Sequence, residues 1–384
     1  MRPLLLALLL AGCGDEAGTG LEAPEPPARL GQDAGAREDA AGTPPADARA
    51  ADAAPSPDAA PPADAADAPD TPDAEPQPVE DMGISPDATP PAGEARSPLP
   101  PLPDYSHGAC PVLLGGPTAD TSVIEGFATG DQVRTFRLMV PSTYDGSRPL
   151  PVIFAWHWLN ASSASFVREA ELESAIEELD FIAVLPDALR NANGDKAYFL
   201  SWPFAEVWGV DGELRFFDDL LACVGDQLNI DRDRVYGIGV SAGGLWLTSL
   251  AMTDRAEHFA SIEVLSGGLG DMLGVWRMEY AAQPNKYPAL VVWGGPTDWL
   301  ALSFHDASMR LRDALVDDGH FVVECTHDAG HGVPPVEPSE EHTKFRFLWR
   351  FMFDHPRSLP AGESPYLAAG LPDFFPAWCS IASE

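Results

Sequence analysis

The chain has 384 residues and a formal net charge of −36. It has no run of Lys or Arg, which argues against nucleic acid and anionic lipid surfaces as partners, because both bind through clustered basic residues. All ten Trp lie beyond residue 150, so the material for a hydrophobic core is concentrated in the later part of the chain.

The first thirteen residues have the layout of a secretory signal peptide. Arg2 precedes the apolar run Leu4–Leu10, which is shorter than the roughly 20 residues that a membrane-spanning helix needs. The sequence Leu10-Ala11-Gly12-Cys13 resembles the lipobox of bacterial lipoproteins. We therefore expect residues 1–13 to be a lipoprotein signal, with Cys13 lipidated.

Residues 14–108 form a low-complexity segment. Of these 95 residues, 63 are Pro, Ala, Asp or Glu, and no aromatic residue precedes Tyr105. Such a composition buries too little apolar surface to offset the entropy of ordering. The sequence predicts a disordered linker over 14–108 and one folded domain over 109–384.

The folded domain contains four cysteines, Cys110, Cys223, Cys325 and Cys379. An even number in an exported protein favours disulfides, and the spacing does not suggest a zinc site. Three pairings remain possible. One of them, Cys110–Cys379, would tie the two ends of the domain together.

The domain is predicted to alternate strands and helices. Period-two alternation over Gln132–Val140 indicates a half-exposed strand. Short apolar runs typical of strands buried on both faces follow at 151–156, 181–185, 234–240, 289–293 and 321–323. Helical periodicity is present at 163–179, 214–228, 242–252, 303–316 and 340–353.

This alternation predicts the fold class. Buried strands joined by helices form a mostly parallel, doubly wound α/β sheet with helices on both faces, here with an antiparallel hairpin at its front edge. Such folds place their chemistry at the carboxyl ends of the strands.

One motif lies at such a strand end. Gly239-Val240-Ser241-Ala242-Gly243 follows the apolar strand 235–240 and begins the helix 242–252, which is the context of a nucleophile elbow, G-x-S-x-G. The glycines allow a turn too tight for side chains. We expect Ser241 to be a catalytic nucleophile.

A serine nucleophile needs a general base and a carboxylate to orient that base. In this fold the chain order is Ser, acid, His. Asp298 follows the strand 289–293 and His331 follows the last strand, so both positions fit. The alternatives are Asp306 for the acid and His327 for the base.

The oxyanion hole requires two backbone N–H groups. One is expected from Ala242, directly after the nucleophile, and the other from the loop after the early strand, where Trp158 and Leu159 are the candidates. Trp158 and Trp202 lie on segments expected near the cleft and are candidate substrate contacts, although packing in the core explains them equally well.

Four segments resemble a known family: Pro149–His157, Phe181–Asp187, Asp231–Gly244 and Gly295–Asp298. They are similar to the polyhydroxybutyrate depolymerase and feruloyl or acetylxylan esterase family of α/β-hydrolases, over most of residues 110–355. Many relatives have His-Gly where this chain has His157-Trp158, so the second oxyanion donor, Leu159 or Trp158, stays open.

The resemblance implies ester hydrolysis without a cofactor or metal, through a Ser-Asp-His triad. We expect an exported, lipid-anchored esterase acting on polyhydroxyalkanoate, feruloyl or acetyl esters, attached to membrane only through Cys13. We expect a monomer at the cell envelope, with the outer membrane or surface favoured, or a secreted protein. The alternatives are a serine peptidase on the same fold and a catalytically silent binding lipoprotein.

Overall fold

The computed structural model describes residues 94–114, 121–203, 209–272, 276–336 and 342–383. The chain divides into two units, Met1–Pro86 and Asp87–Glu384, and every described residue belongs to the second unit. The predicted signal peptide, Cys13 and residues 14–93 of the predicted linker lie outside the described residues.

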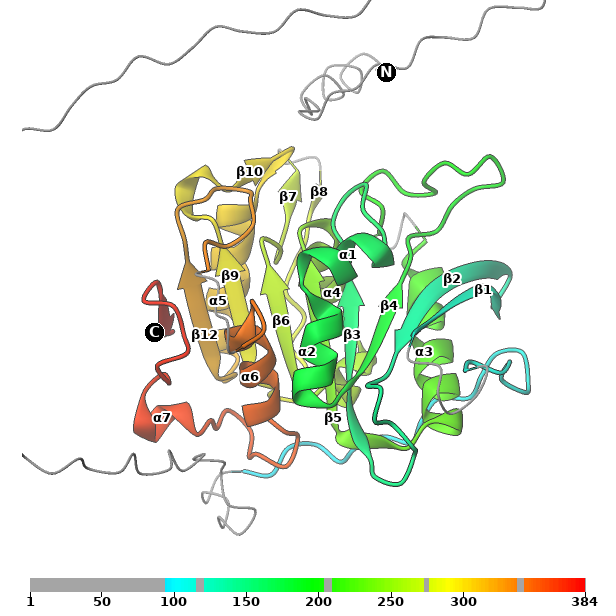
Figure 1. The fold of residues 1–384 in the computed structure, drawn as a ribbon. Helices are drawn as coiled ribbons and strands as arrows, with labels where there is room; N and C mark the ends of the chain where they lie inside the picture. The colour runs from blue at the N-terminus through cyan, green and yellow to red at the C-terminus, as the bar shows by residue number, and fades with distance from the viewer. Residues whose placement is uncertain (1–93, 115–120, 204–208, 273–275, 337–341, 384) are drawn as a thin grey trace, which may run out of the picture. The chain divides into compact units, whose positions relative to one another are not determined.

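A nine-stranded sheet forms the centre of the second unit, with strands in the order β1-β2-β4-β3-β5-β6-β9-β12-β13 (Figure 1). These strands are β1 Thr121–Thr129, β2 Gln132–Met139, β3 Leu150–Trp156, β4 Ile182–Pro186, β5 Ile230–Val240, β6 Ser261–Leu265, β9 Ala289–Trp293, β12 Val322–Thr326 and β13 Cys379–Ile381. From β4 to β12 all neighbours are parallel. The β1–β2 hairpin and β13 are antiparallel edges. The predicted mostly parallel sheet with an antiparallel hairpin is confirmed.

Helices cover both faces of this sheet (Figure 1). The helices are α1 Ser163–Glu169, α2 Leu172–Leu179, α3 Val210–Gln227, α4 Ala242–Ala251, α5 Phe304–Asp317, α6 Arg346–Asp354 and the short α7 Tyr366–Ala369. Apolar residues of α3, α4 and α5 share one core cluster with the strands, and those of α1, α2, α6 and α7 share the other. The core therefore consists of two layers separated by the sheet.

Two short hairpins lie above the carboxyl ends of the central strands (Figure 1). One joins β7 Asp271–Met272 to β8 Trp276–Arg277, and the other joins β10 Trp299–Leu300 to β11 Leu302–Ser303. A single 3₁₀ turn, Gly295–Thr297, connects β9 to Asp298 and β10.

Several parts of the pattern differ from the sequence prediction. The helix expected over 163–179 is two helices, because Glu171 adopts a left-handed backbone with φ 49° and ends the ladder between α1 and α2. The helix expected from residue 340 begins at Arg346, with residues 340 and 341 outside the described residues. The central strand β6 was not predicted.

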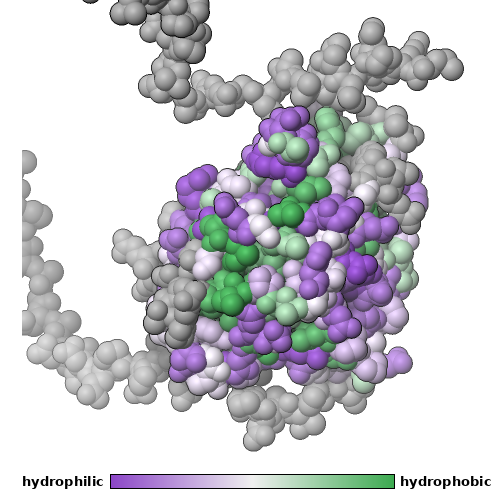
Figure 2. Space-filling view, turned by 90° about the vertical axis from the view of Figure 1, so that its right-hand side faces the viewer, coloured by the Kyte–Doolittle hydropathy of each residue, from purple (hydrophilic) through white to green (hydrophobic). Residues whose placement is uncertain are grey.

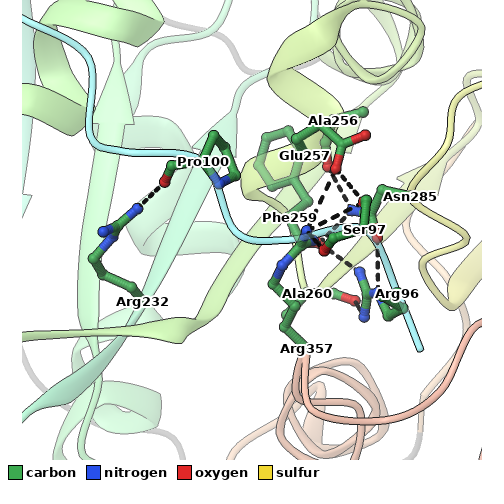
Figure 3. A network of polar contacts seen from close by, with 10 residues as sticks. All are labelled: Arg96, Ser97, Pro100, Arg232, Ala256, Glu257, Phe259, Ala260, Asn285 and Arg357. Carbon is green, nitrogen blue, oxygen red and sulfur yellow. Dashed lines mark hydrogen bonds and ion pairs between the residues drawn. The ribbon is translucent and has the colours of Figure 1, made fainter.

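The end of the predicted linker contacts the domain. Arg96 donates hydrogen bonds to Asn285 Oδ1 at 2.7 Å, to the Ala260 carbonyl at 2.9 Å and to the Phe259 carbonyl at 2.7 Å (Figure 3). Arg357 donates to the Ser97 carbonyl at 2.8 Å. Residues 94–108 are ordered by these polar contacts to the domain, which a reading of apolar content alone cannot detect.

Two disulfides are formed, Cys110–Cys223 and Cys325–Cys379. The first joins the start of the domain to α3, and the second joins the neighbouring strands β12 and β13. The pairing of Cys110 with Cys379 is therefore ruled out.

The surface of the domain is mixed in character. Figure 2 shows the side at the right of Figure 1, where hydrophobic residues form separate groups among hydrophilic ones. Val123 on β1 and Val133 on β2 are among the exposed apolar side chains. Within the described residues, no helix has the length and apolar character needed to cross a bilayer.

Candidate active site

Ser241 lies at the tight turn between β5 and α4. Its backbone has φ 55° and ψ −116°, a conformation that is unfavourable for a residue with a side chain. The Ser241 N–H donates to the Leu265 carbonyl at 2.8 Å, which fixes the turn against the end of β6. The strain and this hydrogen bond match the geometry expected of a nucleophile elbow.

The glycines beside Ser241 are required by close packing of the backbone. A Cβ atom at Gly239 would lie 2.4 Å from the Gly243 carbonyl oxygen, and one at Gly243 would lie 2.2 Å from the Trp156 carbonyl oxygen. The end of β3 therefore lies directly against the first turn of α4. This brings the loop that begins at His157 next to the nucleophile.

The structure brings Ser241, His331 and Asp298 together in one chain of contacts. Ser241 Oγ lies 2.9 Å from His331 Nε2, and His331 Nδ1 lies 2.7 Å from Asp298 Oδ1. An ionised carboxylate only accepts hydrogen bonds, so the Nδ1 proton is donated to Asp298. Nε2 is then free to accept the proton of the Ser241 hydroxyl.

Asp298 is fully buried and held from three directions. Oδ1 faces His331, while Oδ2 accepts hydrogen bonds from the Gly294 N–H at 2.9 Å and from Ser266 Oγ at 2.8 Å. Burial acts to raise the pKa of this carboxyl, but the hydrogen bonds from His331, Gly294 and Ser266 outweigh burial, and the pKa lies below its ordinary value. Asp298 is therefore a carboxylate at neutral pH.

The loops that contain the acid and the histidine touch through their backbones. A Cβ atom at Gly294 would lie 1.8 Å from the Gly330 carbonyl oxygen, and Gly330 has φ 59°. On its other side the His331 ring stacks on Phe304, with the ring centroids 4.3 Å apart. These contacts fix the imidazole between Asp298 and Ser241.

The two alternative residues take structural roles. His327 is buried, its ring packs against Trp378 and its Nδ1 accepts from the Ala329 N–H at 3.2 Å. Asp306 is exposed in the first turn of α5, where its backbone N–H donates the capping hydrogen bond to Ser303 Oγ at 3.1 Å. Among the described residues, neither His327 nor Asp306 forms a hydrogen bond or ring contact with Ser241 or His331.

His157 holds the loop in which the second oxyanion donor is expected. Its ring is buried, Nδ1 lies 2.8 Å from the Trp158 carbonyl, and Nε2 accepts from the Ala188 N–H at 3.3 Å. Burial lowers the pKa of this imidazole, so it is neutral and donates through Nδ1. Because a trans peptide directs its N–H opposite to its carbonyl, the Leu159 N–H points away from His157.

Trp202 has no exposed surface. Its side chain is completely buried, and its Nε1 donates to the His157 carbonyl at 2.8 Å, so its role is to support the His157 loop. Trp158 is only partly buried and packs beside Phe166. Of the two tryptophans proposed from the sequence, only Trp158 has surface left for a ligand.

Sequence reasoning missed Ser266 and Phe304. Ser266 follows β6, which was not predicted, and it has a left-handed backbone with φ 43°. Phe304 is the first residue of α5 and resembles any other core aromatic in the sequence. No group of His, Cys, Asp or Glu side chains suited to a metal ion is present among the described residues.

No protein-family model matches this chain. The chain is 27% identical over 180 residues to feruloyl esterase D of Neurospora crassa, covering 43% of this chain and 54% of that protein. It is 28% identical over 145 residues to feruloyl esterase C of Emericella nidulans, covering 35% and 47%. The chain thus matches about half the length of these curated relatives.

Solved structures show the same fold. Native pOPH has a TM-score of 0.54 and 17% identity, covering 71% of this chain and 97% of that chain. A pOPH variant in complex with DMSO has a TM-score of 0.54 and 15% identity, covering 71% and 95%. The fold of this chain is the α/β-hydrolase fold, and the resemblance to feruloyl esterases found in the sequence is confirmed.

Proposed function

We propose that this protein is a serine carboxylic ester hydrolase with Ser241 as nucleophile, His331 as general base and acid, and Asp298 as the residue that orients His331. The observation that supports this most directly is the pair of distances that join the three residues, 2.9 Å and 2.7 Å. Similarity to feruloyl esterases supports the same reaction class.

In the acylation step, Ser241 Oγ attacks the ester carbonyl carbon while its proton passes to His331 Nε2. The imidazolium formed is stabilised by the carboxylate of Asp298, which is already ionised and fixed by three hydrogen bonds. The tetrahedral intermediate then breaks its bond to the alcohol oxygen. His331 returns the proton to that oxygen, and the alcohol leaves.

The negative oxygen of the intermediate needs two N–H donors. We assign one to Ala242, the first residue of α4, where N–H groups have no partner within the helix. The orientation of the peptide after Trp158 supports Leu159 as the second donor rather than Trp158. Trp158 then remains available as an apolar contact for the acyl group.

In the deacylation step, water replaces the alcohol. His331 Nε2 removes a proton from the water while the water oxygen attacks the acyl carbon. The bond between the acyl carbon and Ser241 Oγ then breaks, and His331 returns the proton to Ser241 Oγ. The proposed substrates are feruloyl, acetyl or hydroxyalkanoate esters, including polymeric ones.

We also propose that residues 1–13 are a lipoprotein signal, that Cys13 is lipidated, and that residues 14–93 tether a catalytic domain of residues 94–384 to the cell envelope. Two disulfides within the domain support an oxidising compartment. Radiolabelled palmitate should label the full chain expressed in a bacterial host. Labelling that persists in Cys13→Ser would contradict this proposal.

Hydrolysis by the purified full chain tests the enzyme proposal. The substrates are p-nitrophenyl acetate, p-nitrophenyl butyrate, methyl ferulate, acetylated xylan, a hydroxybutyrate oligomer and a peptide p-nitroanilide. We expect ester turnover that is lost in Ser241→Ala. Cleavage of the anilide alone would indicate a peptidase, and a folded protein without any turnover would indicate a binding protein.

A further inference from the structure

A hollow lies beside the candidate active site, between the β7–β8 hairpin, the β10–β11 hairpin and the outer face of α5. Its volume is about 570 Å³, within the range of small-molecule sites. Leu302 and Ala307 are buried and form apolar parts of its wall. The hydrolytic mechanism described above does not use it.

The wall of the hollow combines an aromatic ring with charges of both signs. The Trp299 side chain is 56% exposed and lines the hollow. Asp306 and Asp313 offer carboxylate acceptors from α5, and Arg277 offers guanidinium donors from β8. Both Asp side chains and Arg277 are exposed to solvent. Arg277 Nε lies 3.4 Å from Glu279 Oε1, and Asp313 Oδ1 lies 3.0 Å from Arg312 Nε, so the remaining polar atoms of these groups are those accessible to a ligand.

One side of the hollow is held rigidly. Arg310 on α5 donates to the Leu269 carbonyl at 2.7 Å and to the Met278 carbonyl at 2.8 Å. These hydrogen bonds connect α5 to the segments on either side of the β7–β8 hairpin. This connection holds α5, which contains Asp306 and Asp313, against the segment that contains Arg277.

The hollow is linked directly to the catalytic residues. Trp299 follows Asp298 in the chain, and the Asp298 carbonyl accepts hydrogen bonds from the N–H groups of Phe304 and His305 at 3.0 and 3.2 Å. Phe304 stacks on His331. The first turn of α5 thus contacts the catalytic histidine through Phe304 and lines the hollow through Asp306.

We propose that this hollow binds a sugar residue of the ester substrate. Vicinal hydroxyls both donate and accept hydrogen bonds, so they match a wall with carboxylates and a guanidinium together. The C–H face of a sugar ring matches an exposed indole. A polyester offers acceptors only and would match Arg277 alone, and an ammonium ligand offers donors only and would match the carboxylates alone.

This proposal rests on the proposed esterase function for its place in catalysis, but binding to the hollow can be measured without turnover. The first experiment is calorimetric titration of the full-chain Ser241→Ala protein with xylohexaose, cellohexaose, mannohexaose and chitohexaose. We expect at least one oligosaccharide to bind. Adding Arg277→Ala or Trp299→Ala to the Ser241→Ala protein should raise the Kd for that oligosaccharide about tenfold or more. Absence of binding by all four would overturn the proposal.

The second experiment compares substrates of the active protein. We expect Arg277→Ala and Trp299→Ala to lower the ratio of kcat/KM for a feruloylated arabinoxylo-oligosaccharide to kcat/KM for methyl ferulate by about tenfold. The Arg277→Ala variant is included because Trp299 adjoins Asp298, so that substitution of Trp299 also affects catalysis itself. Leu367→Ala, an equally exposed apolar residue on α7, is the control and should leave the ratio unchanged.

The outcomes of the two experiments are distinguishable. An unchanged ratio in both hollow variants would overturn the assignment of the hollow to the substrate's sugar. Failure of the protein to hydrolyse any ester would overturn the proposed function, while the titration would still show whether the hollow binds sugar.

Discussion

Ser266 Oγ lies 2.8 Å from Asp298 Oδ2 and donates a hydrogen bond to it, in a position that is almost completely buried. Ser266 follows β6, which lies in the sheet between β5, the strand directly before Ser241, and β9, the strand that leads to Asp298. The Ser266 N–H also donates to the Val292 carbonyl at 2.7 Å. Ser266 therefore positions the acid of the candidate triad from the neighbouring strand.

Ser266→Ala should lower kcat/KM on a soluble ester by about tenfold. A hydrogen bond to a charged group contributes about 1.5–3 kcal/mol, and its loss raises the pKa of Asp298 and weakens its hold on His331. Ser308→Ala is the matched control, because Ser308 is a buried serine whose hydroxyl donates to the Gly267 carbonyl instead. Equal kinetics in the two variants would argue against the positioning role.

Arg96→Ala should lower the free energy of unfolding by about 3 kcal/mol while leaving kcat unchanged. The substitution removes the hydrogen bonds that Arg96 donates to Asn285 Oδ1 and to the Ala260 carbonyl at the amino end of β6, opposite to the end near Ser241, whereas the Phe259 carbonyl keeps the donor Asn285 Nδ2. Urea denaturation of the full chain measures the effect. As a control, Arg148→Ala removes an exposed ion pair with Asp180 and should cost less than about 1 kcal/mol.

Glu263 should make the stability of the domain fall as pH rises. It lies on β6, is fully buried, and neither of its carboxyl oxygens has a hydrogen-bond partner among the described residues. Burial raises its pKa well above the ordinary value. Between the unfolded pKa, about 4.3, and this higher native pKa, the folded state binds more protons than the unfolded state, so stability is lost with rising pH.

Urea denaturation between pH 5 and pH 9 measures this dependence. Glu263→Met should be more stable than the wild type at pH 8 and should lose less stability across the range, because the buried ionisable group is gone. Glu173→Met, at an exposed position of α2, should keep the wild-type dependence. A Glu263→Met protein with the wild-type pH dependence is the contrary outcome.

The Cys110–Cys223 disulfide should contribute more stability than Cys325–Cys379. The bonded residues are 113 and 54 positions apart, and the entropy of the unfolded chain that a crosslink removes grows with loop length, to about 4.7 kcal/mol for a loop of about 100 residues. Denaturation of the variants Cys110→Ala with Cys223→Ala, and Cys325→Ala with Cys379→Ala, measures both. The reverse order of stability losses would contradict the loop-entropy explanation.

The features that the sequence indicates most directly are those that neighbouring residues in the chain define. Ser241 lies within five residues that specify a turn, and the fully apolar strands β3, β4 and β9 can be recognised without a partner. Asp298 and His331 were selected by their places after strands. The structure places His331 within hydrogen-bonding distance of both Ser241 and Asp298.

The features that the sequence does not indicate concern residues whose positions depend on distant contacts. The strand β6 was missed because Ser261 and Glu263 interrupt its apolar run, although both side chains are buried. Trp202 was expected at the cleft, but tertiary packing buries it behind His157. Arg96 lies in a Pro-rich segment, and its partners are more than 160 residues away in the sequence.

The proposal that Ser241 is an activated nucleophile is tested most directly by covalent labelling with a fluorophosphonate. Intact-mass and peptide analysis of the full chain should find one adduct, on Ser241, and His331→Ala should slow its formation at least a hundredfold, because the general base is lost. Ser241→Ala should take up no label. An unlabelled, folded wild-type protein, or an adduct on another residue, would contradict the proposed function.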